Sequence, residues 1–284
     1  MIILQNGVFK EREEAYLDLD DRGCQFGDGV YEVVGVYEGA FFTLDEHLER
    51  LERSSREIRL VLPLSIEELK QSLSELAEKN GLENGSVYIQ VTRGACARNH
   101  AFPDSSVRAE WLAYPMNPRK PSLEQLHGVG LKTSEDMRWL RCDIKSLNLL
   151  GNVMAKQEAL ENGCYEALLH RNGMITEGAS TNFYVIKDGA VYTHPANNLI
   201  LNGITRMKIK EICNNENIPF YEQPFQLGNL KEADEAFITS TTIEIVPVKL
   251  VDHQIIGSGV PGSLTRKLQE LFKQEIQKEK SVHK

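Results

Sequence analysis

The sequence predicts a two-domain α/β protein, and two observations lead to this expectation. Strand patterns rich in Val and Tyr alternate with amphipathic helices that open on capping boxes, at Thr43–Glu46 and Ser65–Glu68. The stretch PMNPRKP, at 115–121, has the proline content of a linker. We therefore expect a smaller N-terminal α/β domain at 1–116, a linker at 117–121 and a larger C-terminal domain at 122–284 that carries Lys145.

The elements of the first domain follow from turn residues, caps and alternation. Three glycines, Gly23, Gly27 and Gly29, allow a sharp turn before a strand at 30–37. Both faces of that strand are largely apolar, so we expect it to be central in its sheet. The expected elements are strands at 2–8, 30–37, 87–91 and 107–114, and helices that open at Thr43 and Ser65.

Hairpin pairs and helix stops define the second domain in the same way. Asn172-Gly173 and Asp188-Gly189 mark two hairpins, and Gly163 marks the end of a helix. The expected strands lie at 129–133, 165–170, 182–187, 190–193 and 235–240. The expected helices lie at 147–161, from 204 to about 217, and at 263–278.

Composition narrows the class of protein. The 284 residues carry a net charge of −9 without a basic stripe, which argues against nucleic acid as a partner. No run approaches the roughly 18 apolar residues that a membrane span needs, and the first residues do not have the pattern of a signal peptide. The five scattered cysteines fit reduced thiols in the cytoplasm better than disulfides or a zinc site.

Lys145 stands out because it lies amid apolar residues, Ile144, Leu147, Leu149 and Leu150. Lysine is seldom buried without a partner or a function. Partial burial lowers the pKa of an ammonium group, and a neutral amine attacks carbonyl carbon, so this lysine is a candidate Schiff-base former. The ordinary alternative is that its stem packs while its charged end reaches water.

Other polar residues supply the remaining parts of a site. Glu177 is the one acid in a small, polar turn, and Asn202-Gly203-Ile204-Thr205 opens a helix whose N–H groups form an anion seat. Arg98 and His100 point the same way in extended backbone and suit a carboxylate. The alternatives are an ordinary polar loop for this pair, a core position for Tyr31 and a solvated helix face for Arg50.

Together these residues match the needs of a pyridoxal phosphate enzyme. Such an enzyme needs a lysine, an acid for the pyridine nitrogen, a phosphate seat and a cation for the substrate carboxylate. Lys145, Glu177, the helix start with Ser240-Thr241-Thr242, and Arg98 with His100 meet these needs.

The chain also resembles the fold-type IV pyridoxal phosphate enzymes, which include branched-chain aminotransferases, D-amino acid aminotransferases and aminodeoxychorismate lyases. Within this group it is most similar to the D-amino acid aminotransferases, because of WLRCDIKSLNLLGNV and the Arg98-Asn99-His100 match to their R-x-H motif. The other shared segments are RGCQFGDGVYE at 22–32, TEGASTNFYVIKDGAVYTHP at 176–195, GITR at 203–206 and ADEAFITSTTIEIVPV at 233–248.

The resemblance implies a role for each candidate residue. Lys145 would be the Schiff-base lysine and proton carrier, and Glu177 would pair with the pyridine nitrogen. Tyr31, Arg98 and His100 would bind the substrate carboxylate, the last two from the second subunit of a homodimer. The cofactor would lie at the domain interface. Its other contacts would be Arg50, Leu201, Ile204, Thr205, Ser240 and Thr241.

The expected activity is transamination of D-amino acids, from D-alanine and 2-oxoglutarate to pyruvate and D-glutamate. Two alternatives on the same fold are a branched-chain L-amino acid aminotransferase and an aminodeoxychorismate lyase. An alternative of another class is a non-catalytic protein that binds pyridoxal phosphate. Cys96 and Asn99, near the expected carboxylate site, depart from the family pattern and bear on which substrates fit.

Overall fold

A computed structural model describes residues 1–117 and 122–282, with the side chains of 122 and 280–282 excepted. The described chain divides into two compact units. One takes in residues 1–117, 144–148 and 279–282, and the other takes in 122–143 and 149–278. Beyond residue 117, the expected linker at 117–121 lies outside the described residues, so its role stays a prediction.

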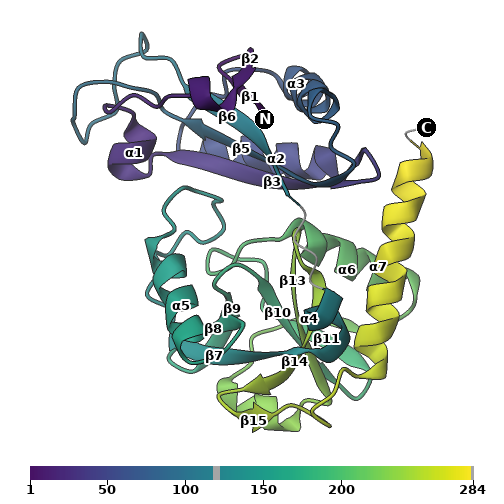
Figure 1. Ribbon diagram of the computed structural model, residues 1–284. Coiled ribbons are helices and arrows are strands. Elements are labelled where there is room, and N and C mark those ends of the chain that lie inside the picture. The colour runs from purple at the N-terminus through teal and green to yellow at the C-terminus, as the bar shows by residue number, and fades with distance from the viewer. Residues whose placement is uncertain (118–121, 283–284) are drawn as a thin grey trace. The chain divides into compact units, whose positions relative to one another are not determined.

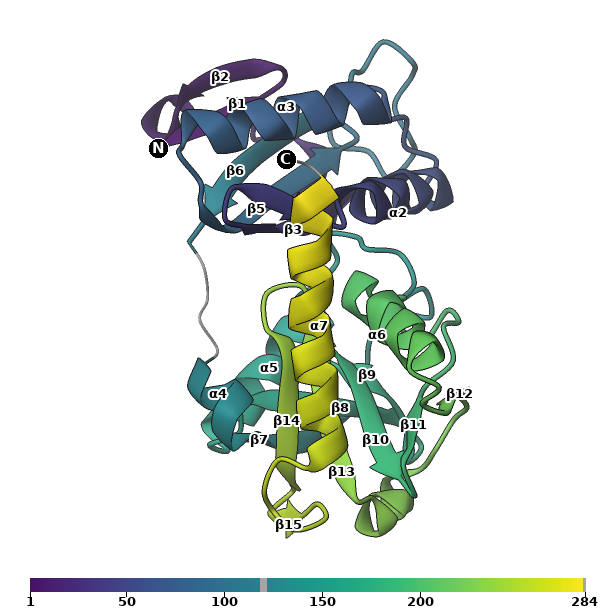
Figure 2. The same cartoon turned by 90° about the vertical axis from the view of Figure 1, so that its right-hand side faces the viewer.

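The first unit is built on an antiparallel six-stranded sheet in the order β2-β1-β6-β5-β3-β4 (Figure 1). Helices α2 and α3 pack against this sheet and against each other (Figure 2). The strands are β1 (Ile2–Gln5), β2 (Val8–Glu11), β3 (Gly29–Tyr37), β4 (Ala40–Phe42), β5 (Asn84–Thr92) and β6 (Glu110–Met116). The helices are η1 (Arg12–Glu14), α1 (Arg22–Phe26), α2 (Leu44–Glu57) and α3 (Ile66–Lys79).

Alternation along β3 gives this unit its core. Val30, Val34 and Val36 are buried with the leucines of α2 and α3, which follow one another at helical spacing. The Ser65 capping box is present at the start of α3, as expected, whereas the Thr43 side chain makes no capping hydrogen bond to α2. The expected central place of β3 is confirmed by its full pairing with β5.

The second unit is built on a mixed nine-stranded sheet in the order β12-β11-β10-β13-β14-β7-β8-β9, with β15 on β14. Its strands are β7 (Val129–Glu135), β8 (Glu166–Arg171), β9 (Met174–Gly178), β10 (Asn182–Lys187), β11 (Ala190–Thr193), β12 (Phe220–Glu222), β13 (Glu235–Ser240), β14 (Glu244–Val251) and β15 (Gln254–Ile255). Its helices are α4 (Ser122–His127), α5 (Leu150–Glu161), α6 (Ile204–Asn215), η2 (Leu227–Glu232) and α7 (Ser263–Val282), whose last described residues group with the first unit.

Two sequence expectations about the lysine segment are wrong. The helix expected at 147–161 begins at Leu150, because the Leu147 N–H donates instead to the Gly29 carbonyl at 3.0 Å. Lys145, expected in the C-terminal domain, belongs to the first compact unit. The physical reason is strand-like pairing, since residues 144–148 run along the part of β3 that β4 does not cover.

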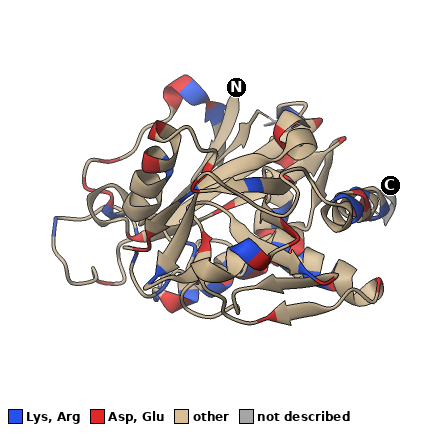
Figure 3. Cartoon of the chain, turned by 90° about the horizontal axis from the view of Figure 1, so that it is seen from below, with Lys and Arg blue, Asp and Glu red and all other residues tan. Residues whose placement is uncertain are grey.

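Charge is distributed in mixed sign along the chain. Figure 3 shows Lys and Arg interspersed with Asp and Glu, for example along α7. No helix in the described part of the chain combines the length and the hydropathy that crossing a bilayer requires.

Candidate active site

Lys145 is fixed by backbone pairing, and its amine lies over an aromatic ring. The Tyr31 N–H donates to the Lys145 carbonyl at 3.0 Å, and the Lys145 N–H donates to Ser54 Oγ on α2 at 3.3 Å. Lys145 Nζ is 4.3 Å from the centre of the Tyr31 ring. Leu150 is 72% exposed, so it does not form part of the apolar surroundings expected from the sequence. The half-buried amine is thus held against Tyr31, at a distance typical of a cation–π contact.

The other face of β3 carries a buried ion network. Glu32, which is 0% exposed, accepts from Arg50 Nε at 2.7 Å and Nη2 at 2.9 Å, and it contacts His47 Nδ1 at 2.7 Å. Burial opposes the charge of Glu32, but Arg50 and His47 hold its pKa well below the ordinary value. The solvated face considered for Arg50 is therefore wrong, because its guanidinium is buried and oriented by Glu32.

The loop that carries Arg98 and His100 is anchored on α1. Both side chains are exposed and lie against Phe26, with the Arg98 guanidinium 4.4 Å and the His100 ring 5.4 Å from the Phe26 ring centre. Buried Arg22 donates to the carbonyls of Asn99 at 2.6 Å and Ala101 at 3.3 Å. The structure therefore brings the expected pair together and reveals Arg22 as its support.

In the second unit, Glu177 is a buried carboxylate at the end of β9. Its Oε1 accepts from Arg138 Nη1 at 2.8 Å, and its Oε2 accepts from Asn182 Nδ2 at 3.0 Å. The Leu201 N–H donates to both oxygens, at 3.2 and 3.1 Å. Burial raises the pKa of Glu177 to about 7, although Arg138 and the hydrogen bonds act to lower it. The carboxyl therefore lies near its titration midpoint at neutral pH.

The start of α6 lies beside this carboxylate. Asn182 also donates to the Leu201 carbonyl at 2.8 Å, and Gly203 approaches Asn182 so closely that a Cβ atom there would lie 2.2 Å from its Oδ1. The α6 helix has no side-chain cap at Gly203. Because the first N–H groups of a helix lack partners within it, Ile204 and Thr205 form an anion seat.

The hydroxyl cluster follows β13 at the same end of the sheet as Asn182. In the sheet register Asn182 pairs with Thr239, and the next residues along β13 are Ser240 and then Thr241 in the turn. Ser240 Oγ lies 3.4 Å from Thr242 Oγ1. Within each unit, then, most of the residues predicted from the sequence lie together.

Three groups of functional residues were missed by the sequence reasoning. They are Glu32 with His47, Arg22, and Asp136 with Arg138 and Asn182. A signal existed for Glu32, an acid within an apolar strand, because a buried acid needs a cationic partner. Arg138 and Asp136 come together only through side-chain geometry that sequence spacing does not give.

The sequence of the chain can now be set beside known families and structures. The family described as amino-transferase class IV matches residues 29–251. The chain belongs to this family. A D-alanine aminotransferase from Bacillus licheniformis is 49% identical over 276 residues, which cover 97% of each chain. One from Staphylococcus aureus strain N315 is 49% identical over 97% of this chain and 98% of its own.

Solved class IV aminotransferases share the fold. The Escherichia coli branched-chain amino acid aminotransferase superposes with a TM-score of 0.91 at 27% identity, covering 95% of this chain and 93% of its own. A second branched-chain amino acid aminotransferase, from T.th. and solved with pyridoxamine 5'-phosphate, has a TM-score of 0.89 at 28% identity, covering 95% and 92%. The expected fold-type IV, α/β architecture is confirmed.

Proposed function

We propose that this class IV aminotransferase transfers amino groups between D-amino acids and 2-oxo acids with pyridoxal 5'-phosphate as cofactor. Its reaction is D-alanine with 2-oxoglutarate, giving pyruvate and D-glutamate. The observation that carries the assignment is 49% identity to a D-alanine aminotransferase over 97% of the chain, against 27% for the branched-chain enzyme of E. coli. The Arg98-Asn99-His100 match to the D-amino acid branch agrees with it.

The donor sets of the two units fit this cofactor. A buried carboxylate bound by three N–H donors, Glu177, suits a protonated ring nitrogen. The uncapped start of α6, at Ile204 and Thr205, suits a phosphate. Arg50, Ser240 and Thr241 would add to the phosphate contacts, and Leu201, fixed by Glu177, would lie behind the ring.

When bound, the cofactor supplies an aldehyde that takes up the amino group and a ring that withdraws electrons from the α-carbon. Lys145 would hold that aldehyde through Nζ and, once released, would take the α-proton and return it on the other side of the exchange. Its backbone pairing with β3 fixes the origin of this side chain, so the amine needs only to rotate about its own stem. Glu177 holds the compensating negative charge.

The substrate carboxylate would be bound by Tyr31, Arg98 and His100. We infer that Arg98 and His100 come from the second subunit of a homodimer, and that the enzyme is cytoplasmic. The carboxylate geometry would leave the α-hydrogen of a D-amino acid facing Lys145. The partners of the protein would then be small substrates and a second copy of the chain.

An amino-donor panel tests the function. With 2-oxoglutarate as acceptor, we expect D-alanine to give pyruvate at least about 100-fold faster, in kcat/KM, than L-alanine or L-leucine. The measurement is pyruvate formation, read with a coupled dehydrogenase, and 2-oxo acid formation for leucine. Ready use of L-leucine without D-alanine would favour the branched-chain reading. Pyruvate released from aminodeoxychorismate would favour the lyase.

Arg22 offers a prediction about the substrate loop. Replacing Arg22 with glutamine removes the anchors on Asn99 and Ala101. We expect KM for D-alanine and 2-oxoglutarate to rise about 10-fold, because a loosened loop lowers the population that can bind a carboxylate, with a much smaller change in kcat. Steady-state kinetics with both substrates measures the split. A fall in kcat at unchanged KM would contradict the role given to Arg22.

A further inference from the structure

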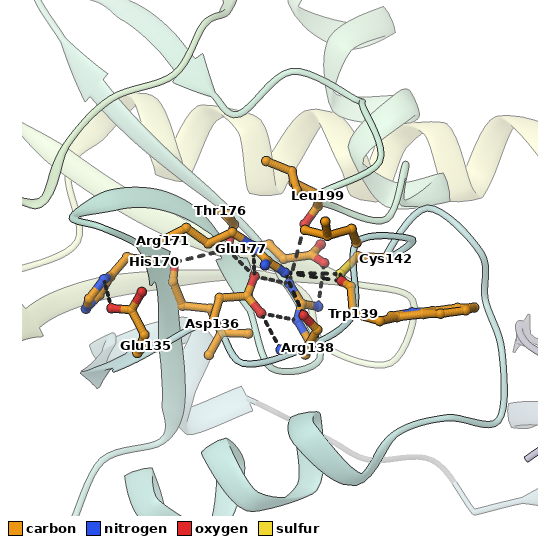
Figure 4. A network of polar contacts seen from close by, with 12 residues as sticks. Glu135, Asp136, Arg138, Trp139, Cys142, His170, Arg171, Thr176, Glu177 and Leu199 are labelled. Carbon is orange, nitrogen blue, oxygen red and sulfur yellow. Dashed lines mark hydrogen bonds and ion pairs between the residues drawn. The ribbon is translucent and has the colours of Figure 1, made fainter.

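Arg138 joins two buried carboxylates of the second unit. Its Nε and Nη2 donate to Asp136 Oδ1 and Oδ2, each at 2.9 Å, and its Nη1 donates to Glu177 Oε1 at 2.8 Å. Figure 4 shows the guanidinium between the two acids. Two parallel bonds to one carboxylate fix the plane of an arginine, which a lysine could not reproduce. The third bond is therefore aimed by the first two.

Asp136 is itself held in place, so the anchor is rigid. Its side chain is 0% exposed and accepts from Thr176 Oγ1 at 3.0 Å, and Arg171 Nε lies 3.3 Å from it. Its backbone N–H donates to the His170 carbonyl at 2.7 Å. Burial opposes the charge of Asp136, but its bonds from Arg138 hold its pKa below the ordinary value. The fixed charge of Asp136 thus orients Arg138.

The charged groups around Glu177 work in opposite directions. Burial and the charge of Asp136 raise the pKa of Glu177, while Arg138 lowers it. Burial works against the charge of Arg138, yet Glu177 and Asp136 hold its pKa above the ordinary value, so it stays a cation. The titratable and charged groups that interact with Glu177 are Asp136 and Arg138 after β7, Cys142 in the following loop and Tyr184 on β10.

We propose that Arg138 is a positioning residue for the amino transfer: fixed by Asp136, it orients Glu177 and keeps that carboxylate charged. The inference rests on the proposed function, in which Glu177 pairs with the ring nitrogen. A neutral carboxyl group could not balance the charge of a protonated pyridine. Arg138 acts through Glu177, so its effect is on the proton of that acid.

The first experiment reads that proton in cofactor-free protein. The infrared band of the protonated Glu177 carboxyl, assigned by its loss in Glu177→Gln, is followed against pH. We expect Arg138→Gln to raise the midpoint by about one pH unit or more, since an adjacent arginine lowers a carboxyl pKa by about 1–3 units. Arg138→Lys, which keeps the charge without the fork, should give a midpoint between the two.

A matched control is Arg141→Gln. Arg141 pairs with Asp143, also two residues away, at 3.0 and 3.1 Å, and is 40% exposed. Its loss should leave the Glu177 midpoint in place. An unchanged midpoint in folded Arg138→Gln would overturn the proposal. If that variant does not fold, Arg138→Lys decides, and a wild-type midpoint there would overturn it.

The pH profile of the loaded enzyme separates this role from a structural one. In Arg138→Gln the acid limb of kcat for D-alanine should move upward by the same number of pH units as the infrared midpoint, so activity recovers at alkaline pH. A uniform loss at every pH would instead mean a structural role and overturn the proposal. Because the infrared reading needs neither substrate nor cofactor, it stands even if the wild-type enzyme fails to use D-alanine.

Discussion

Replacing Lys145 with alanine should abolish amino transfer, with kcat for D-alanine falling by about 10⁴-fold or more. The residue would serve both as the group that holds the cofactor aldehyde and as the proton carrier, and a positioned acid–base group alone contributes about 10²–10⁴-fold. The measurement is pyruvate formation under saturating D-alanine and 2-oxoglutarate. Absorbance of the added cofactor and borohydride labelling at position 145 provide a second reading.

Lys156→Ala is the control for this variant. Lys156 is the next lysine along the chain, and its ammonium lies 3.6 Å from Glu166, away from the residues assigned to the site. This variant should keep most of its activity, and thermal unfolding of both proteins should show that they fold. Activity of Lys145→Ala close to wild type would rule out the assigned mechanism and favour a protein that only binds the cofactor.

Replacing Glu177 with glutamine should lower kcat by about 10²–10³-fold, the usual loss when one preorganised electrostatic group is removed. Glutamine keeps the shape and the bond from the Leu201 N–H, but it removes the charge that would keep a ring nitrogen protonated. Steady-state kinetics with D-alanine measures the effect. Wild-type kcat in this variant would contradict the role of the carboxylate. Glu166→Gln, which alters another buried acid of the same sheet, shows how much loss is only structural.

The same variant tests the pKa in cofactor-free protein. Burial raises the pKa of Glu177 from 4.5 to about 7, so the folded state binds the proton more tightly than the unfolded state. The carboxyl thus contributes stability that is complete below about pH 4.5 and is lost as the pH rises through about 7. Relative to Glu177→Gln, the wild type should lose roughly 3 kcal/mol of unfolding free energy across this window. Urea unfolding at several pH values measures it, and parallel curves would contradict it.

Much of the fold could be predicted because it depends on local patterns. The hairpins at Asn172-Gly173 and Asp188-Gly189 and the Ser65 cap are set by neighbouring residues. The position of Lys145 could not be predicted in this way. Its segment continues into a helix in sequence, but the free edge of β3 accepts its backbone hydrogen bonds, and tertiary pairing therefore overrides the local helical preference.

The candidate site divides along the same line. Lys145, Glu177 and the α6 start could be proposed because their residue types carry specific chemistry and the family resemblance gives them roles. The partners that set their charge could not. Arg50 looked solvated in a charged helix, since nothing in its spacing revealed that Glu32 turns toward it from a strand. Arg138 looked like one more polar residue until its two carboxylates were seen on the same guanidinium.

Strand β3 has one further consequence, because neighbouring residues on it serve opposite sides. Tyr31 lies under the Lys145 amine, and Glu32 holds Arg50. A single insertion or deletion between Gly29 and Tyr31 would exchange the two sides at once, leaving an acid under the amine and a phenol against the guanidinium. Divergence in substrate preference is therefore confined to loops, and the length of this strand cannot vary by an odd number of residues while the enzyme stays active.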